Sequence, residues 1–114
     1  MRAMMIGLGL VLGMASGSAL AADRTATGAI LAGDYATAER TLATERRIFP
    51  KRPELMLNLA AVYRQTGREA EARALYADVL RREAVPMDMI DQRTASSHAI
   101  AQVGLARLSQ VASR

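Results

Sequence analysis

The stretch NLAAVYRQTGREAEARALYADVL, residues 58–80, has the pattern of a helix, a turn and a second helix. Apolar residues recur three and four positions apart in its first part, which is the spacing of an amphipathic helix. Gly67 follows, and a glycine closes a helix well because it adopts the left-handed backbone conformation without steric cost. The same apolar spacing returns after Gly67. The stretch therefore predicts two antiparallel helices joined by a tight turn.

The flanking residues mark the ends of these two helices. Pro53 suits the first turn of a helix, where its missing N–H costs no hydrogen bond, and Glu54 lies favourably at the positive end of the helix dipole. The second helix is predicted over residues 68–83, with Asp78 and Arg82 as an acid–base pair one turn apart on its exposed face.

Part of this pattern also occurs 34 residues earlier in the chain, where AGDYATAERTL, residues 32–42, aligns with TGREAEARALY, residues 66–76. Three pairs of positions agree at this offset: Gly33 with Gly67, Ala38 with Ala72, and Leu42 with Tyr76. Repetition at such a period indicates supersecondary units stacked side by side, each of which needs its neighbour to bury its apolar face.

The later unit resembles a tetratricopeptide repeat, whose pattern is W-x-x-L-G-x-x-Y followed by A-x-x-x-F. The corresponding positions of this chain hold Met56, Leu59, Ala60, Tyr63, Ala72 and Tyr76. In the earlier unit, Gly33, Ala38, Leu42 and Pro50 resemble the second helix and the closing proline of the same motif. The resemblance implies an all-α fold, a TPR-like α-solenoid fragment of stacked helix-turn-helix hairpins, with two hairpins over residues 22–84.

A third unit is only partly present. Ile100, Val103, Gly104 and Arg107 fit another first helix, but they come ten residues later than the period predicts. The extra residues are placed in a loop insert over residues 85–96, where Pro86 interrupts the helical pattern. Too few residues follow for a partner helix, so a single C-terminal capping helix is predicted over residues 97–112, with Ser96 or Ser97 as its N-cap.

The N-terminus has the features of a secretory signal peptide, predicted over residues 1–21. Arg2 provides a positive start, an uncharged apolar run covers residues 3–15, and Ala19-Leu20-Ala21 is a cleavage signature. The alternative is a retained membrane anchor, but the apolar run is shorter than the roughly 20 residues that a spanning helix needs. We therefore expect a periplasmic or secreted protein of bacterial type, without a stable membrane span after cleavage.

Composition limits the possible chemistry. The chain has no cysteine, which excludes disulfides and thiolate zinc sites. The formal net charge is +4, and it becomes +3 without Arg2, so nucleic acid is not an expected partner. The local run ERRIFPKR, residues 45–52, is interpreted as a solvated helix end whose cations favour the negative end of the helix dipole.

No catalytic arrangement is predicted, because the acidic residues are scattered along helices among arginines and no nucleophile or phosphate-loop motif occurs. Met87, Met89 and His98 could in principle bind copper(I) through soft thioethers and an imidazole. Methionine is more often filler in a core or loop, so a protein without a metal or cofactor is favoured.

In this family the first helix of each unit lines a concave groove that binds partners. The resemblance implies that the partner-binding residues are Leu57, Asn58, Ala61, Arg64 and Gln65. Asn58 matches an asparagine that holds a peptide backbone or carboxylate in the family, while Leu57 replaces the lysine expected beside it. The expected function is a non-enzymatic adaptor for a protein or peptide of the cell envelope.

The alternative function is a structural module that self-associates. Two units and a cap are fewer than the roughly three repeats needed for independent stability, so exposed repeat ends would favour a homodimer.

Overall fold

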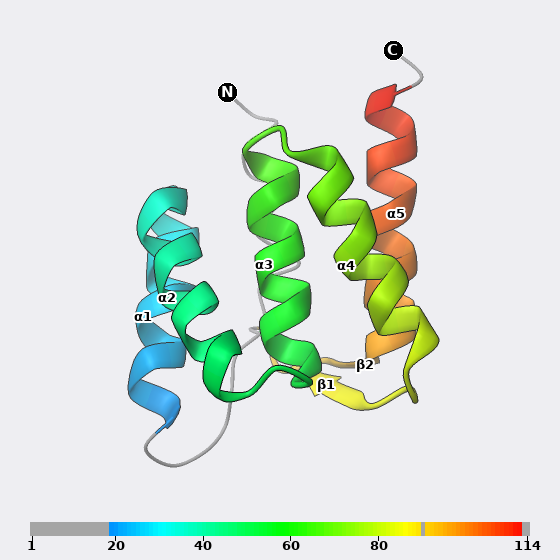
Figure 1. The fold of residues 1–114 in the computed structure, drawn as a ribbon. Helices are drawn as coiled ribbons and strands as arrows, with labels where there is room; N and C mark the ends of the chain where they lie inside the picture. The colour runs from blue at the N-terminus through cyan, green and yellow to red at the C-terminus, as the bar shows by residue number, and fades with distance from the viewer. Residues whose placement is uncertain (1–18, 90, 113–114) are drawn as a thin grey trace.

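Antiparallel helices build the fold, and each lies beside its neighbour in the sequence (Figure 1). The computed structural model describes residues 19–89 and 91–112. The elements are α1 (Ala19–Ala32), α2 (Tyr35–Ile48), α3 (Pro53–Gln65), α4 (Glu69–Arg81), β1 (Pro86–Asp88), β2 (Thr94–Ser96) and α5 (Ser97–Ala112). Consecutive helices pack against each other, and α3 also contacts α5. This arrangement confirms the stacked hairpins and the C-terminal helix that the repeat pattern predicts.

The two turns within the hairpins have the same geometry. Gly33 and Gly67 both have φ +80°, in the left-handed region where a side chain would be strained. The amide of Asp34 donates to the carbonyl of Ala29 at 2.8 Å, and the amide of Arg68 donates to Tyr63 at 2.8 Å, 34 residues further on. These bonds satisfy carbonyls at the helix ends, so the sequence repeat is also a repeat of backbone structure.

Local signals also begin the helices where the sequence places them. Asp34 caps α2, because its carboxylate accepts a hydrogen bond from the amide of Thr37 at 3.3 Å. Pro53 occupies the first turn of α3, as predicted. Residues 55–62 of α3 are all buried, because this helix packs against α2, α4 and α5. Thus α3 is the centre of the fold.

The repeat positions form most of the core. Small residues lie where helices approach closely, and larger side chains fill the remaining space. The fully or almost fully buried repeat positions are Ala38, Leu42, Met56, Leu59, Ala60, Ala72 and Tyr76. Tyr63 is half-buried against this core, and Pro50 is exposed in the turn after α2.

Two sequence expectations differ in detail from the structure. Residues 85–96, expected as a loop, contain an antiparallel hairpin in which Met87 of β1 pairs with Ala95 of β2 and is itself buried in the core. The second helix of the later unit ends at Arg81 rather than near Glu83. The first helix begins at Ala19, so it overlaps the end of the segment predicted as a signal peptide, and cleavage after residue 21 would shorten it.

The predicted signal peptide lies outside the described residues, apart from residues 19–21 at the start of α1. Within the described part of the chain, no helix has the length and apolar character needed to cross a membrane.

An ion pair joins the two repeat units. The guanidinium of Arg68, at the start of α4, forms a bidentate ion pair with the carboxylate of Glu39 on α2. The distance from Nη1 of Arg68 to Oε2 of Glu39 is 2.9 Å. The same guanidinium lies 4.5 Å from the centroid of the Tyr63 ring. Hydrogen bonding from Arg68 is the largest cause holding the pKa of Glu39 below its ordinary value of 4.5.

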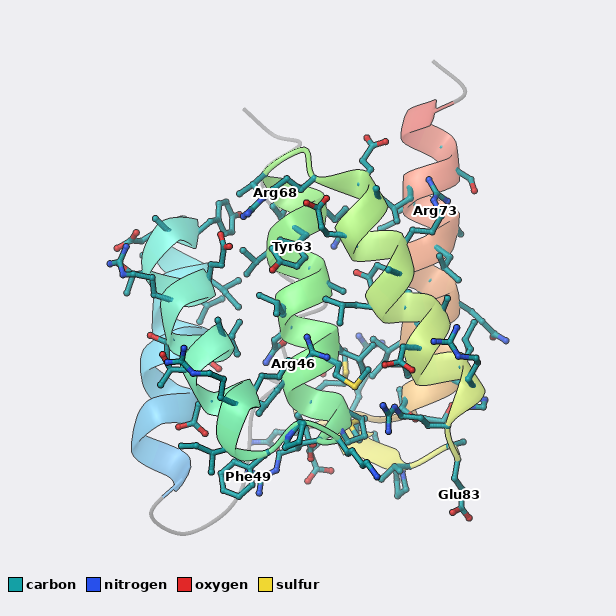
Figure 2. All side chains as sticks on the ribbon, viewed as in Figure 1. Arg46, Phe49, Tyr63, Arg68, Arg73 and Glu83 are labelled. Atoms are coloured by element: carbon teal, nitrogen blue, oxygen red, sulfur yellow. The ribbon has the colours of Figure 1, made fainter. Side chains whose placement is uncertain are left out.

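We predict that Glu39→Gln makes the protein less stable at neutral pH and flattens its loss of stability in acid. Because the folded pKa is lowered, the carboxylate contributes stability above its unfolded pKa and loses that contribution as pH falls through the folded pKa. The effect is modest, since the pair is partly exposed and screened by solvent. Melting temperatures at pH 7 and pH 3 measure it, with exposed Glu83, which extends away from the end of α4, as the matched Glu→Gln control (Figure 2). Equal pH profiles for both variants would contradict the prediction.

Candidate partner-binding face

The five residues predicted to bind a partner lie along α3, but they differ in accessibility. Leu57, Asn58 and Ala61 are each at most 3% exposed, and Leu57 belongs to the hydrophobic core. Arg64 and Gln65, one turn further along, are half-buried. As the fold stands, the first three offer no open surface to a partner, so the binding role of this set stays a prediction.

Arg64 is the most informative of the five. Its Nε and Nη2 atoms are buried and have no hydrogen-bond partner among the described residues. Burying guanidinium donors without acceptors is unfavourable, whereas a carboxylate satisfies such donors in pairs. The geometry of Arg64 therefore favours an anionic ligand.

A pocket of 290 Å³ lies between the β-hairpin and the start of α5. Its walls combine aliphatic side chains with two arginines. The lining residues are Met89, Arg93, Thr94, Ala95, Ala99, Ile100, Val103 and Arg107. Val103 is 43% exposed, whereas Ile100, one turn earlier on α5, is buried. The pocket is thus an apolar hollow with cationic groups among its walls.

Hydrogen bonds at the base and at the turn of the hairpin fix the wall that it contributes to this pocket. Ser97, which is buried, donates its amide to the carbonyl of Val85 at 2.8 Å and accepts the Val85 amide on its hydroxyl at 2.9 Å. At the hairpin turn, the carboxylate of Asp91 accepts from the amide of Arg93 at 3.2 Å and from its Nε at 2.6 Å. The Val85–Ser97 bonds tie the start of the hairpin to the start of α5, and the Asp91–Arg93 bonds stabilise the turn between the strands.

The start of α5 is fixed in the same way. The hydroxyl of Ser96 accepts a hydrogen bond from the amide of Ala99 at 3.0 Å, which is the N-cap contact predicted for Ser96 or Ser97. Nε2 of His98 lies 2.7 Å from the carbonyl oxygen of Arg82 and so ties α5 to the end of α4. Both contacts explain why the pocket has a defined position.

These positions also bear on the copper alternative. Met87 fills the core and His98 contacts a backbone carbonyl, which are structural roles. Among the described residues, no group of three or more His, Cys, Asp or Glu side chains is placed to hold a metal ion.

The electrostatics of the pocket connect α5 with α3. Burial is the largest cause lowering the pKa of Arg107, and the positive charge of Arg64 lowers it further. The two arginines therefore lie near enough to repel each other in partly desolvated surroundings. An anion held between them would relieve that repulsion.

Sequence reasoning identified Arg64 but missed the pocket. The missing element was the hairpin, whose three-residue strands are too short to give a clear alternating pattern. Arg107 had a weak signal, because it occupies a position where the repeat pattern has an aromatic residue.

Comparison with known families gives one match. Residues 29–86 match the family model of the tetratricopeptide repeat, which spans the second part of α1 through α4 and the start of β1. Searches of curated proteins and of solved structures found no match.

Proposed function

The chain belongs to the tetratricopeptide repeat family of protein-interaction modules, and we propose that it is a non-enzymatic adaptor that binds an acidic peptide segment of a cell-envelope protein between α3 and α5. The observation that carries the proposal is the buried, unpartnered pair of donors on Arg64, close enough to Arg107 to lower its pKa.

In the proposed mechanism, a carboxylate of the partner binds between Arg64 and Arg107. Arginine donors bind carboxylates with two parallel hydrogen bonds, which fixes the orientation of the peptide. An aliphatic side chain of the same peptide then enters the pocket and contacts Ile100 and Val103. Charge and apolar contact together give specificity for a segment in which an acidic and an aliphatic residue are near neighbours.

One further feature supports an adaptor of the envelope. The signal sequence predicted over residues 1–21 would direct the chain to the periplasm or the exterior.

We expect Arg64→Gln to weaken binding of an acidic, leucine-containing peptide by about tenfold to a hundredfold, because a hydrogen bond to a charged group contributes about 1.5–3 kcal/mol. Titration of a fluorescent peptide into the full-length protein measures the change. Arg73→Gln is the matched control, since Arg73 is exposed on α4 and does not line the pocket (Figure 2).

The proposed site is wrong if Arg64→Gln and the control Arg73→Gln bind the peptide with the same affinity. It is also wrong if a peptide with lysine in place of its acidic residues binds as tightly. Thermal melting of each variant shows that the fold is retained, and the loss of two buried donors that lack acceptors should leave Arg64→Gln at least as stable as the parent.

Self-association is the second candidate, and exposed apolar residues at both ends of the repeat stack favour it. Leu31 of α1 is 47% exposed and Val103 of α5 is 43% exposed. A second copy that covered either end would bury this surface. Sedimentation at micromolar concentration separates the two candidates, because a folded monomer is incompatible with obligate dimerisation.

A further inference from the structure

The turn between α2 and α3 exposes two large apolar side chains next to each other. Ile48 is 63% exposed and Phe49 is 36% exposed. Figure 2 shows Phe49 at the lower end of α2, where the chain turns toward α3. Single exposed apolar residues are common, but an adjacent pair at the tip of a turn needs a reason.

Cationic side chains flank this pair on both sides. Arg46 and Arg47 precede it, and Lys51 and Arg52 follow it. We call residues 46–52, which are the end of α2 and the turn that follows it, the basic–apolar loop. None of its four cations forms an ion pair with a carboxylate in the described part of the chain, where the ion pairs involve Arg68, Arg81, Arg82 and Arg93.

The charge of this region is a large share of the total. With Glu45 and Glu54 included, residues 45–54 carry four positive and two negative charges, so their net charge of +2 is half of the formal +4 of the whole chain. The helix dipole explains Arg46 and Arg47 in the last turn of α2. It does not explain why Ile48 and Phe49 are held in solvent between the cations.

The conformation of the loop is defined by its own contacts. The amide of Phe49 donates to the carbonyl of Glu45 at 2.9 Å, and the amide of Arg52 donates to the carbonyl of Phe49 at 3.3 Å. The guanidinium of Arg52 lies 4.0 Å from the centroid of the Phe49 ring. The ring therefore stays at the tip of the turn with a cation stacked on it.

We propose that the basic–apolar loop binds the surface of a bilayer that contains anionic lipids. Ile48 and Phe49 enter the boundary between headgroups and acyl chains, while the four cations contact lipid phosphates. Long cationic side chains suit this position, because their aliphatic stems lie along apolar surface while their charges stay in water. This membrane contact is independent of the peptide site proposed above and adds a second binding surface.

The topology supports a membrane rather than a peptide as the occupant. Because α1 and α2 are antiparallel, the start of α1 lies at the same end of the fold as the loop (Figure 1). A second pocket of 290 Å³, lined in part by Arg46, Arg47 and Pro50, lies between α2 and α3, but neither Ile48 nor Phe49 lines it. Ile48 and Phe49 are therefore exposed outside this pocket, at an end of the helices that a flat bilayer can reach.

The absence of tryptophan from the sequence makes a local test possible. Phe49→Trp places a single indole at the tip of the loop in the full-length protein. On addition of phosphatidylglycerol-containing vesicles, its emission should shift to shorter wavelength and be quenched by brominated acyl chains, while phosphatidylcholine vesicles should produce neither effect. Leu31→Trp is the matched control, because Leu31 is exposed near the turn between α1 and α2, at the opposite end of these helices. Its emission should not change.

Charge variants test the electrostatic part of the proposal. Arg47→Gln with Lys51→Gln should weaken partition into anionic vesicles by about thirtyfold, since each cation near such a surface contributes about a factor of five. Arg73→Gln with Arg81→Gln removes two exposed charges from α4 and should leave partition nearly unchanged. Arg64→Gln should also leave it unchanged, which separates this proposal from the peptide site.

Three results would overturn the membrane assignment. One is an indole at position 49 that responds no more than the indole at position 31. Another is an equal loss of partition in both double variants, which would reduce the effect to net charge. The third is binding of an acidic polypeptide, but not of vesicles, that depends on Arg47 and Lys51.

Discussion

Gly104→Ala is expected to destabilise the protein by about 1–3 kcal/mol, although alanine is the better helix former. A Cβ atom at position 104 of α5 would lie 2.5 Å from Cε1 and 2.6 Å from Cε2 of Tyr76 on α4. The Tyr76 ring is 1% exposed, so it has little room to move aside. The steric cost therefore exceeds the gain of up to about 1 kcal/mol in helix propensity. Urea denaturation of the parent and the variant measures the difference.

Gly28 provides the matched control for this prediction. It is exposed on α1, and a Cβ atom there would meet nothing within 4 Å. Gly28→Ala should therefore stabilise the protein by up to about 1 kcal/mol. Combining Gly104→Ala with Tyr76→Leu removes the clashing ring atoms, and the two changes together should cost less than the sum of their separate effects. If Gly104→Ala behaves like Gly28→Ala, the close packing of α4 on α5 is wrong.

The Gly104–Tyr76 contact shows what sequence periodicity can predict. Gly104 was assigned to a small position of a third unit despite the ten-residue insertion, and the structure places it against the ring of the preceding unit. The turns at Gly33 and Gly67 were equally predictable, because a positive φ favours glycine wherever it occurs. Features that depend on local backbone conformation or on one adjacent helix were therefore available from the sequence.

The exposure of the side chains along α3 could not be predicted from the sequence in the same way. The spacing of apolar residues distinguishes one face of a helix from another, but it does not reveal how many neighbours surround the helix. Because α3 packs against three other helices, even Asn58 is 0% exposed, although its residue type is typical of a surface. A prediction that took the family groove from the repeat pattern could not anticipate this burial.

The pocket was hidden for a different reason. Its walls come from the hairpin turn, β2 and α5, and their juxtaposition depends on hydrogen bonds between Val85 and Ser97, twelve residues apart. Three-residue strands carry almost no periodic signal. The arginines were visible as residue types, whereas the proximity of Arg64 to Arg107 is a tertiary property of packing α5 against α3.

Leu42→Ala is expected to destabilise the protein by about 2–5 kcal/mol, the range for truncating a buried leucine. Leu42 lies on α2 and is completely buried, and α2 packs against both α1 and α3. The total free energy of unfolding of a small domain lies near the low end of about 5–15 kcal/mol. The variant would therefore lose a large share of its stability and melt at a lower temperature. Leu31→Ala is the control, because Leu31 is 47% exposed and its truncation should cost less than about 0.5 kcal/mol.

The same variant tests whether the repeat units fold together. If each unit needs its neighbour to bury its apolar face, the loss at Leu42 reaches the later unit through the α2–α3 contact. Amide hydrogen exchange should then accelerate in α4 as well as in α1 and α2, and urea unfolding should remain a single transition shifted to lower concentration. A variant that loses protection in α1 and α2 alone, or that unfolds in two steps, would show that residues 53–112 are stable without the first hairpin. In that case the stacked repeats would be separate units rather than one cooperative fold.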